Sequence, residues 1–127
     1  MNEFRLSIPC AVDELMGLRR ALGEWLQEHA VPAEQSFHVR LVANEAASSA
    51  IERSRSCDSV TVQAAVDGTD VRVEVLDSGE PEAGSTGAVR GLTLIQAVAS
   101  VALHPQEAGN RLVMHVRPGA PTNRAVS

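Results

Sequence analysis

The chain has 127 residues, a length that suits a single domain with a core of its own. Apolar residues make up 44% of it and aromatic residues only 2%, so we expect a core of leucine, valine, isoleucine and alanine. The formal net charge is −5, and every basic residue is an arginine. The lack of lysine excludes a P-loop enzyme of the usual kind, and the lack of a basic patch beyond Arg53–Arg55 argues against nucleic acid as a direct partner.

The chain carries no signal for export or for membrane insertion. No apolar run approaches the roughly 20 residues that span a bilayer, and the first residues lack the apolar stretch of a signal peptide. We therefore expect a cytoplasmic protein without a membrane partner. Cys10 and Cys57 show neither metal-ligand spacing nor a secreted disulfide pattern, so we expect two reduced, largely buried thiols.

The first half of the chain predicts one strand followed by two helices. Apolar and polar residues alternate over residues 4–8, which indicates a strand with one buried face. Between residues 11 and 29, leucines and Trp25 recur at three- and four-residue steps, the pattern of an amphipathic helix. Val31-Pro32 ends this helix, and a second, more deeply buried helix is expected over about residues 33–54.

The second half predicts a hairpin, a loop, a short helix and two strands. Valines alternate on both sides of Asp67-Gly68, which predicts an antiparallel hairpin whose second strand ends at Asp77. Residues 78–89 contain several glycines and no periodicity, so we expect a flexible loop there. After it we expect a helix over residues 91–101, a strand around 102–104, a turn at 107–110 and a last strand over 111–116.

This order of elements predicts an α+β fold rather than a doubly wound parallel sheet. The natural layering is a two-layer sandwich, in which about three helices cover one face of a mostly antiparallel sheet. We expect one domain over residues 1–117 and a disordered tail over 118–127.

Glu45 and Ser49 are the first candidate site residues. Their spacing of four places both side chains on one face of the second helix. A carboxylate at a core edge can act as a general base toward a hydroxyl or a water. The alternative is an ordinary solvated helix glutamate.

A second candidate is the end of the hairpin, Asp77-Ser78-Gly79. An aspartate at a strand end can accept a hydrogen bond from an exocyclic amine, and a glycine beside it lets a planar ring approach the backbone. The alternative is a turn aspartate that caps its own loop. A third candidate is the junction where the glycine-bearing loop enters the helix at Gly91, since free backbone N–H groups there suit phosphate oxygens.

The joint order of these features resembles the GHKL ATPase superfamily, which includes gyrase-type ATPases and histidine kinases. Within it, residues 41–52, with the sequence LVANEAASSAIE, are similar to the asparagine box of the bacterial anti-sigma-factor serine kinases. The segment from Ile8-Pro9 to Val31-Pro32 also resembles the N-terminal half of that branch. The likeness extends to about Val116.

The resemblance implies a fold of the GHKL (Bergerat) type and a nucleotide site with a role for each matching residue. Glu45 matches the glutamate that acts as base or orients the attacking hydroxyl. Asp77 matches the aspartate that binds the adenine amino group, and Gly79 the glycine beside it. The implied cofactors are ATP and Mg²⁺, with Ser49 at the position of the metal ligand.

The phosphates would lie against a lid. Gly91 and Gly87 match its glycines, and Leu92 follows them at the start of the helix. Gly109 and Asn110 match, more loosely, a late turn that closes the adenine pocket. The implied partners are a sigma factor and an anti-anti-sigma protein of the STAS type, and the resemblance also implies a homodimer.

The chain departs from this family pattern at four positions. Ser49 stands where the family has the asparagine that holds magnesium, and Arg53 where it commonly has a histidine. Pro81 replaces a glycine after Asp77-Ser78-Gly79, and Val89 replaces the first glycine of the lid.

Three functions remain open on this basis. The chain is a serine/threonine kinase that phosphorylates an anti-anti-sigma partner and sequesters a sigma factor, or a non-catalytic binding module of the same fold. The third interpretation is an anti-anti-sigma substrate, because Asp77-Ser78-Gly79 is similar to the phosphorylated motif of those proteins. A helix should then begin directly after Ser78, whereas Glu80-Pro81-Glu82 follows.

Overall fold

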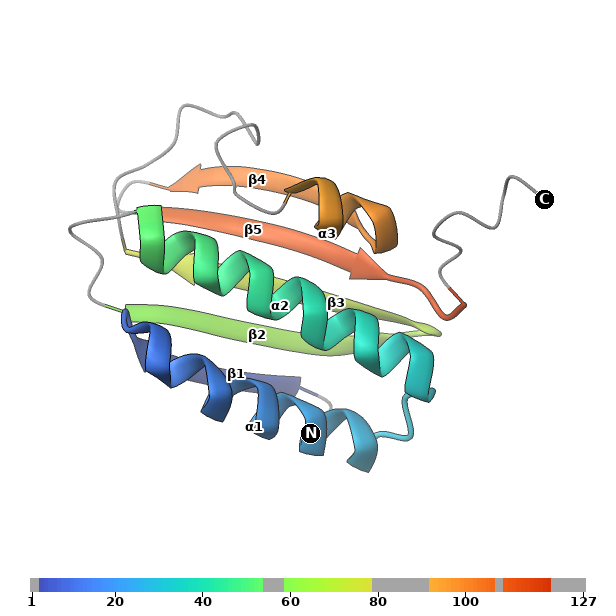
Figure 1. Ribbon diagram of the computed structural model, residues 1–127. Helices are drawn as coiled ribbons and strands as arrows, with labels where there is room; N and C mark the ends of the chain where they lie inside the picture. Colours follow the sequence, from blue (N-terminus) through green and yellow to red (C-terminus); the bar gives the residue numbers. More distant parts are fainter. Residues whose placement is uncertain (1–2, 54–58, 79–91, 107–108, 120–127) are drawn as a thin grey trace.

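The computed structural model describes residues 3–53, 59–78, 92–106 and 109–119 (Figure 1). Its five strands form one sheet of order β1-β2-β3-β5-β4, in which every neighbouring pair is antiparallel. The strands are β1 (Glu3–Pro9), β2 (Ser59–Asp67), β3 (Asp70–Asp77), β4 (Ser100–Gln106) and β5 (Gly109–Val116).

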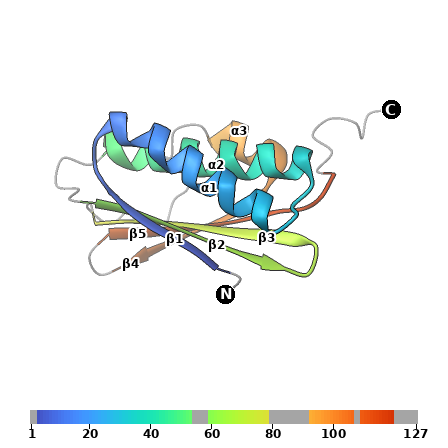
Figure 2. The ribbon, with the colours of Figure 1, turned by 90° about the horizontal axis from the view of Figure 1, so that it is seen from below.

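Within the described residues, three α-helices cover one face of this sheet. They are α1 (Leu15–Glu28), which follows a short 3₁₀ turn, α2 (Ala33–Arg53) and α3 (Leu92–Val98). Figure 2 shows all three on the same side of the strands. The predicted α+β sandwich, with helices on one face of an antiparallel sheet, is confirmed.

The ends of α1 follow from local chemistry. Its buried stripe repeats at helical spacing and comprises Leu15, Leu18, Leu22, Trp25 and Leu26. The helix stops because Ala30 adopts the left-handed conformation (φ 55°), and the Val31 N–H then donates to the Leu26 carbonyl at 3.0 Å. Pro32 follows and starts the turn into α2, whose Ser36 N–H donates to the Pro32 carbonyl at 2.8 Å.

Helix α2 is the central element of the helical layer. It contacts α1 and α3 on its flanks and β2, β3 and β5 beneath it. Gln35, which is 2% exposed, anchors the first turn of α2. The Gln35 Nε2 donates hydrogen bonds to the carbonyls of Thr69 and Val116, both at 2.9 Å. These bonds tie α2 to the hairpin turn and to the end of β5.

The sheet has one apolar face and one polar face. Alternate valines of β2 and β3 point toward the helices and are buried, whereas the opposite face carries polar side chains. Glu74 lies on that polar face and accepts hydrogen bonds from Arg111 Nε at 2.8 Å and Arg72 Nε at 3.1 Å. The hydrogen bond from Arg111 is the main reason that the pKa of Glu74 lies below its ordinary value, with the charges of both arginines adding to it.

Two predicted boundaries are wrong. The helix expected over residues 91–101 ends at Val98, because Val101 instead joins β4 opposite Met114. The turn expected at 107–110 does not include Gly109 and Asn110, which pair with Gln106 and Pro105 as the first residues of β5. In both places cross-strand pairing overrides the local pattern.

The prediction of reduced cysteines is wrong for Cys10, which is disulfide-bonded. Cys10 follows the end of β1 and packs, partly buried, against the core. Cys57, most of the predicted 78–89 loop and residues 120–127 of the predicted tail lie outside the described residues. Among the helices that the structure describes, none is long and apolar enough to cross a membrane.

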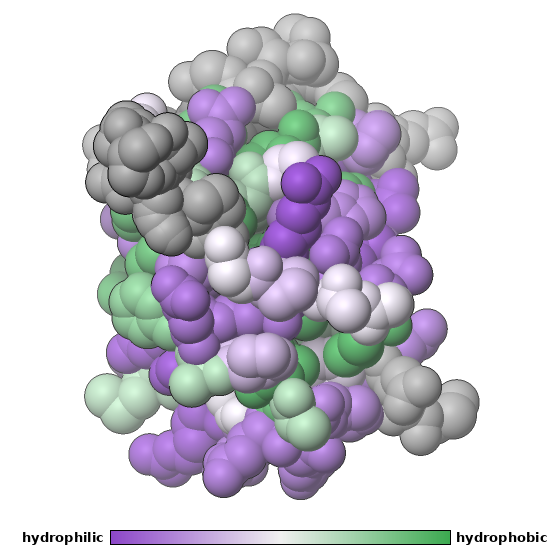
Figure 3. All heavy atoms as spheres, turned by 90° about the vertical axis from the view of Figure 1, so that its right-hand side faces the viewer, coloured by the Kyte–Doolittle hydropathy of each residue, from purple (hydrophilic) through white to green (hydrophobic). Residues whose placement is uncertain are grey.

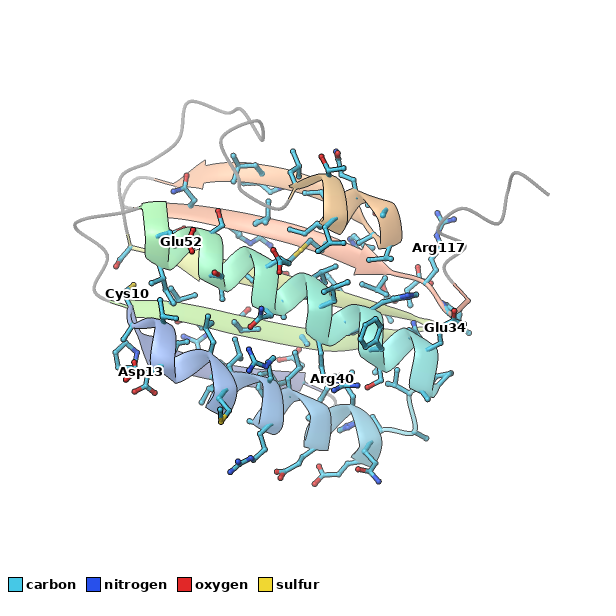
Figure 4. The ribbon with its side chains drawn as sticks, viewed as in Figure 1. Cys10, Asp13, Glu34, Arg40, Glu52 and Arg117 are labelled. Carbon is cyan, nitrogen blue, oxygen red and sulfur yellow. The ribbon has the colours of Figure 1, made fainter. Side chains whose placement is uncertain are left out.

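The end of the molecule with the α1–α2 turn and the β2–β3 hairpin has a mixed surface. Figure 3 shows hydrophilic side chains there with apolar patches between them. A cavity of about 250 Å³ opens at this end, and its lining includes Val31, Val66, Val71 and the buried Gln35. In Figure 4, Glu34 and Arg117 lie at this end, whereas Cys10, Asp13 and Glu52 lie at the other.

We expect the stability contributed by Glu74 to depend on pH. Because its pKa is lowered on folding, the carboxylate stabilises the folded state above its unfolded pKa, and this contribution disappears as the pH falls through the folded pKa. Glu74→Gln should lower the free energy of unfolding by about 1 kcal/mol at pH 7, since the arginines are partly solvated.

Urea unfolding at pH 7 and at pH 3 measures this effect, with Glu28→Gln on the exposed surface of α1 as the matched control. The difference between wild type and Glu74→Gln should shrink toward zero at pH 3. An equal difference at both pH values would contradict the role of the charged pair.

Candidate functional site

Three elements converge at the end of the molecule opposite the hairpin turn. Helix α2 ends there, β3 ends there at Asp77, and β5 begins there at Gly109 (Figure 1). The view from below shows the same arrangement (Figure 2). Residues 45–53, 75–77 and 109–110, distant in sequence, thus belong to one end of the fold.

Asp77 and Asn110 form a buried polar pair at this end. Both continue the alternation that points Val75 and Leu112 toward the helices, so both side chains lie on the inner face of the sheet. The two residues are direct partners in the β3–β5 register. Asp77 is 9% exposed and Asn110 2%, and Asn110 Nδ2 donates to Asp77 Oδ1 at 3.4 Å.

Gly109 allows β5 to approach this pair closely. Its φ of +129° lies in a region that favours glycine, and a Cβ built on it would collide with the Asp77 carbonyl oxygen. The same Cβ would lie 2.9 Å from the Asp77 carbonyl carbon and 3.1 Å from the Ser78 Cα. The close contact with the end of β3 therefore needs a glycine at this position.

Glu45 and Ser49 lie in the C-terminal half of α2. Glu45 is half-buried, and Ser49 is 2% exposed. The helix that carries them contacts β3, β5 and α3. The structure thus places both predicted residues on the helix that covers the Asp77 strand.

The predicted phosphate region lies mostly outside the described residues. Gly79, Gly87 and Gly91 are not described, nor are Pro81 and Val89. Leu92 is half-buried and is the first residue of α3. The roles of these residues in binding the phosphates stay predictions.

Among the described residues at this end, few side chains could coordinate a metal ion. Within the described ranges, no cluster of three or more histidine, cysteine, aspartate or glutamate side chains could hold a metal ion. Magnesium, however, commonly binds through one or two protein oxygens together with substrate phosphates. Glu45 and Ser49 can supply such oxygens, so the residues present fit a metal held jointly with a nucleotide.

Sequence reasoning gave Asn110 only as a loose match and missed its contact with Asp77. The alternation of inward- and outward-pointing residues along the two strands could have indicated this pair. Asp77 stands two residues after Val75, and Asn110 two residues before Leu112, so each continues a buried row by one step. Only the register of β3 with β5 then brings the two side chains together.

A second concave feature lies between α1 and α2. This groove, of about 520 Å³, is lined by three arginines, Arg19, Arg20 and Arg40, and by Glu24 among other residues. Arg19 Nη1 donates to Asn44 Oδ1 at 2.9 Å, and Arg40 lies between the two helices (Figure 4). The positive charge of the arginines in this groove suits an acidic protein segment better than a nucleotide base.

The structure is that of an α+β domain. The buried carboxylate of Asp77, which can accept a hydrogen bond, lies at the end of β3 at the edge of the helical layer. The chain belongs to the family described as "Histidine kinase-like ATPase domain", which it matches over residues 8–116. The predicted superfamily is confirmed, and membership in a family of ATPase domains implies ATP binding. A search of curated proteins finds no match to the chain.

Solved structures with the same fold include a protein with RsbU and RsbW domains and a histidine kinase. The RsbU and RsbW domains of Rv1364c from Mycobacterium tuberculosis superpose with a TM-score of 0.76 at 20% identity, covering 92% of this chain and 32% of that one. The blue-light activated histidine kinase of Erythrobacter litoralis EL346 gives a TM-score of 0.55 at 14% identity, covering 91% and 47%. Its separate histidine kinase domain gives 0.52 at 16%, covering 87% and 62%. The chain thus spans less than two thirds of each.

Gly109→Ala should disturb both stability and the site. The new methyl group would collide with the Asp77 carbonyl, and the positive φ would strain any side chain. We therefore expect the free energy of unfolding to fall by about 1–3 kcal/mol or more. Gly17→Ala is the matched control, because no atom lies within 4 Å of the added Cβ in α1. That change should leave stability equal or raise it by up to about 1 kcal/mol. Thermal unfolding of both variants checks this, and equal melting temperatures would contradict the close approach.

Proposed function

We propose that the chain binds ATP at this end of the fold and acts as an anti-sigma factor that phosphorylates an anti-anti-sigma partner. The observation that carries the proposal is the buried Asp77 carboxylate, held by Asn110 at a strand end, in a chain of the ATPase-domain family. A buried carboxylate is costly unless it is hydrogen-bonded. A ligand that donates a hydrogen bond to it therefore gains affinity and specificity.

Adenine supplies such a donor through its exocyclic amino group. In this proposal Asp77 accepts from that group, and Gly109 lets β5 lie close to the end of the strand that carries Asp77. Gly79 lets the ring approach the backbone, and Gly87 and Gly91 lie against the phosphates.

The chain's own residues would then position the reacting groups. Phosphoryl transfer depends mainly on positioning and on neutralising the charge of the phosphates, which a bound magnesium ion supplies. Glu45, a half-buried carboxylate, orients the attacking serine hydroxyl of the partner or accepts its proton. Ser49 offers a hydroxyl oxygen toward the metal.

The partners follow from the same proposal. The structural likeness to a protein with an RsbW domain supports a role in partner switching, in which a sigma factor and a STAS-type protein compete for one regulator. A homodimer in the cytoplasm, without direct contact to nucleic acid or membrane, belongs to this proposal.

A second candidate is a non-catalytic binding module of the same fold, and Ser49 favours it. A serine hydroxyl reaches less far than the asparagine carbonyl expected at this position, and Ser49 is almost fully buried. The arginine-lined groove between α1 and α2 adds a surface for an acidic partner that needs no nucleotide.

Asp77→Asn tests the nucleotide site directly. Replacing one acceptor oxygen by an N–H group faces the adenine amino group with a donor, so ATP affinity should fall by about 10- to 100-fold. Asp67→Asn, an exposed residue in the hairpin at the other end, is the matched control and should bind like wild type. Calorimetric titration with ATP measures the affinities, and unchanged binding by Asp77→Asn would falsify the site.

Ser49→Asn separates the kinase from the binding module. If Ser49 serves the metal, wild type should bind ATP at micromolar strength only with magnesium. The Ser49→Asn variant should then bind ATP with magnesium several-fold more tightly, without a change of binding in EDTA. Ser48→Asn, half-buried on the same helix, controls for the added bulk. If neither Ser49→Asn nor Ser48→Asn changes the affinity for ATP in the presence of magnesium, Ser49 is not a metal ligand. The non-catalytic module then becomes the better proposal.

A further inference from the structure

The cavity of about 250 Å³ lies at the end of the molecule opposite Asp77, the end that faces the viewer in Figure 3. The α1–α2 turn, the β2–β3 hairpin and the segment after β5 all contribute to its wall. Most of this wall is apolar and comes from Val31, Pro32, Val66, Val71 and Pro118. Because an apolar protein cavity of about 150 Å³ can hold benzene, this cavity has room for a molecule of one or two rings.

The buried amide of Gln35 gives the cavity a hydrogen-bond acceptor. Gln35 Nε2 donates to the carbonyls of Thr69 and Val116, and since both partners only accept, the orientation of the amide is fixed. Among the described residues, none donates a hydrogen bond to Gln35 Oε1, and this oxygen stays accessible although the residue is 2% exposed. Gln35 belongs to the wall of the cavity, so its accessible oxygen faces the cavity.

His29 adds a second acceptor to the same wall. His29 Nδ1 lies 2.9 Å from the Trp25 carbonyl oxygen, which can only accept, so Nδ1 carries the hydrogen and Nε2 of the neutral ring is an acceptor. The hydroxyl of the exposed Thr69 both donates and accepts, so it does not shift this balance. Among the described residues that line the cavity, none is an aspartate, a glutamate or an arginine. The wall therefore suits an uncharged molecule that donates a hydrogen bond, because a buried charge would find no partner there.

We propose that this cavity is a binding site for a small, uncharged molecule of one or two rings whose N–H or O–H group donates to Gln35 Oε1. The rings contact the apolar wall, and the donor satisfies an acceptor that is otherwise left without a protein partner. The site lies at the end of α2 far from Glu45 and Ser49, and it is independent of the proposed binding of ATP. Its occupation would stabilise the folded chain, since the unfolded chain has no such cavity.

Indole and benzofuran are the probes, because they share one shape and benzofuran has an oxygen where indole has its N–H group. Calorimetry on the full chain measures both affinities. We expect indole to bind with a dissociation constant below about 1 mM, which small ligands commonly reach. Benzofuran should bind about tenfold more weakly, because it leaves the Gln35 acceptor unpaired. Backbone amide chemical shifts should change most at residues 29–35 and 66–71 when indole is added.

Two variants test the wall and the acceptor separately. Val66→Phe places a ring in the cavity and should weaken the binding of both probes at least tenfold. Val113→Phe, at a half-buried valine on the polar face of the sheet, is the matched control and should bind like wild type. Gln35→Met keeps the length of the side chain without the acceptor, so the affinities for indole and benzofuran should come within about twofold of each other. Circular dichroism checks that each variant is folded.

Each part of the inference has a result that would overturn it. If wild type does not bind indole, or the chemical shifts change mainly elsewhere, the cavity is not the site. Equal affinities of wild type for indole and benzofuran would contradict the need for a donor, and a tenfold preference that persists in Gln35→Met would contradict the role of Gln35. If Gln35→Met does not fold, the preference of wild type for indole and the loss of binding in Val66→Phe are both required. The proposed ATP site is tested independently by Asp77→Asn.

Discussion

The antiparallel pairing of β3 with β5 is the constraint on which the rest of the site depends. The register of this pairing places Asp77 opposite Asn110. Gly109, the residue before Asn110, lets the β5 backbone approach the Asp77 carbonyl closely. Two polar side chains are thereby held in an apolar layer, where their hydrogen bond offsets the cost of burial. A shift of one residue in this register would turn Asn110 to the other face of the sheet.

Helix α2 connects this site to the remainder of the fold. At its start the buried Gln35 binds the backbone of the hairpin and of β5, which fixes the position of the helix along the sheet. About three to four turns further on, the same helix carries Glu45 and Ser49 over the ends of the strands. The positions of these two side chains relative to Asp77 are therefore set by contacts at the far end of the molecule as well as by local packing.

The proposed site divides into a part for the base and a part for the phosphates. In the proposed base-binding part, the structure describes the buried Asp77 and Asn110 and the close approach of Gly109 to the end of β3, whereas Gly79 lies outside the described residues. In the proposed phosphate part, Ser49, Pro81 and Val89 depart from the pattern that the resemblance to the anti-sigma-factor kinases implies. Since phosphoryl transfer relies on metal and phosphate positioning, we expect these departures to affect catalysis more than recognition of the nucleotide.

Local patterns were sufficient to predict the α+β class, the two long helices and the Asp67-Gly68 hairpin. Each of these depends on periodicity, on proline and on turn residues close together in the chain. The start of β5 at Gly109, the end of α3 at Val98 and the contact of Asp77 with Asn110 could not be predicted in this way. They depend on which strands become neighbours, and the order β1-β2-β3-β5-β4 follows from how the whole layer buries its apolar face.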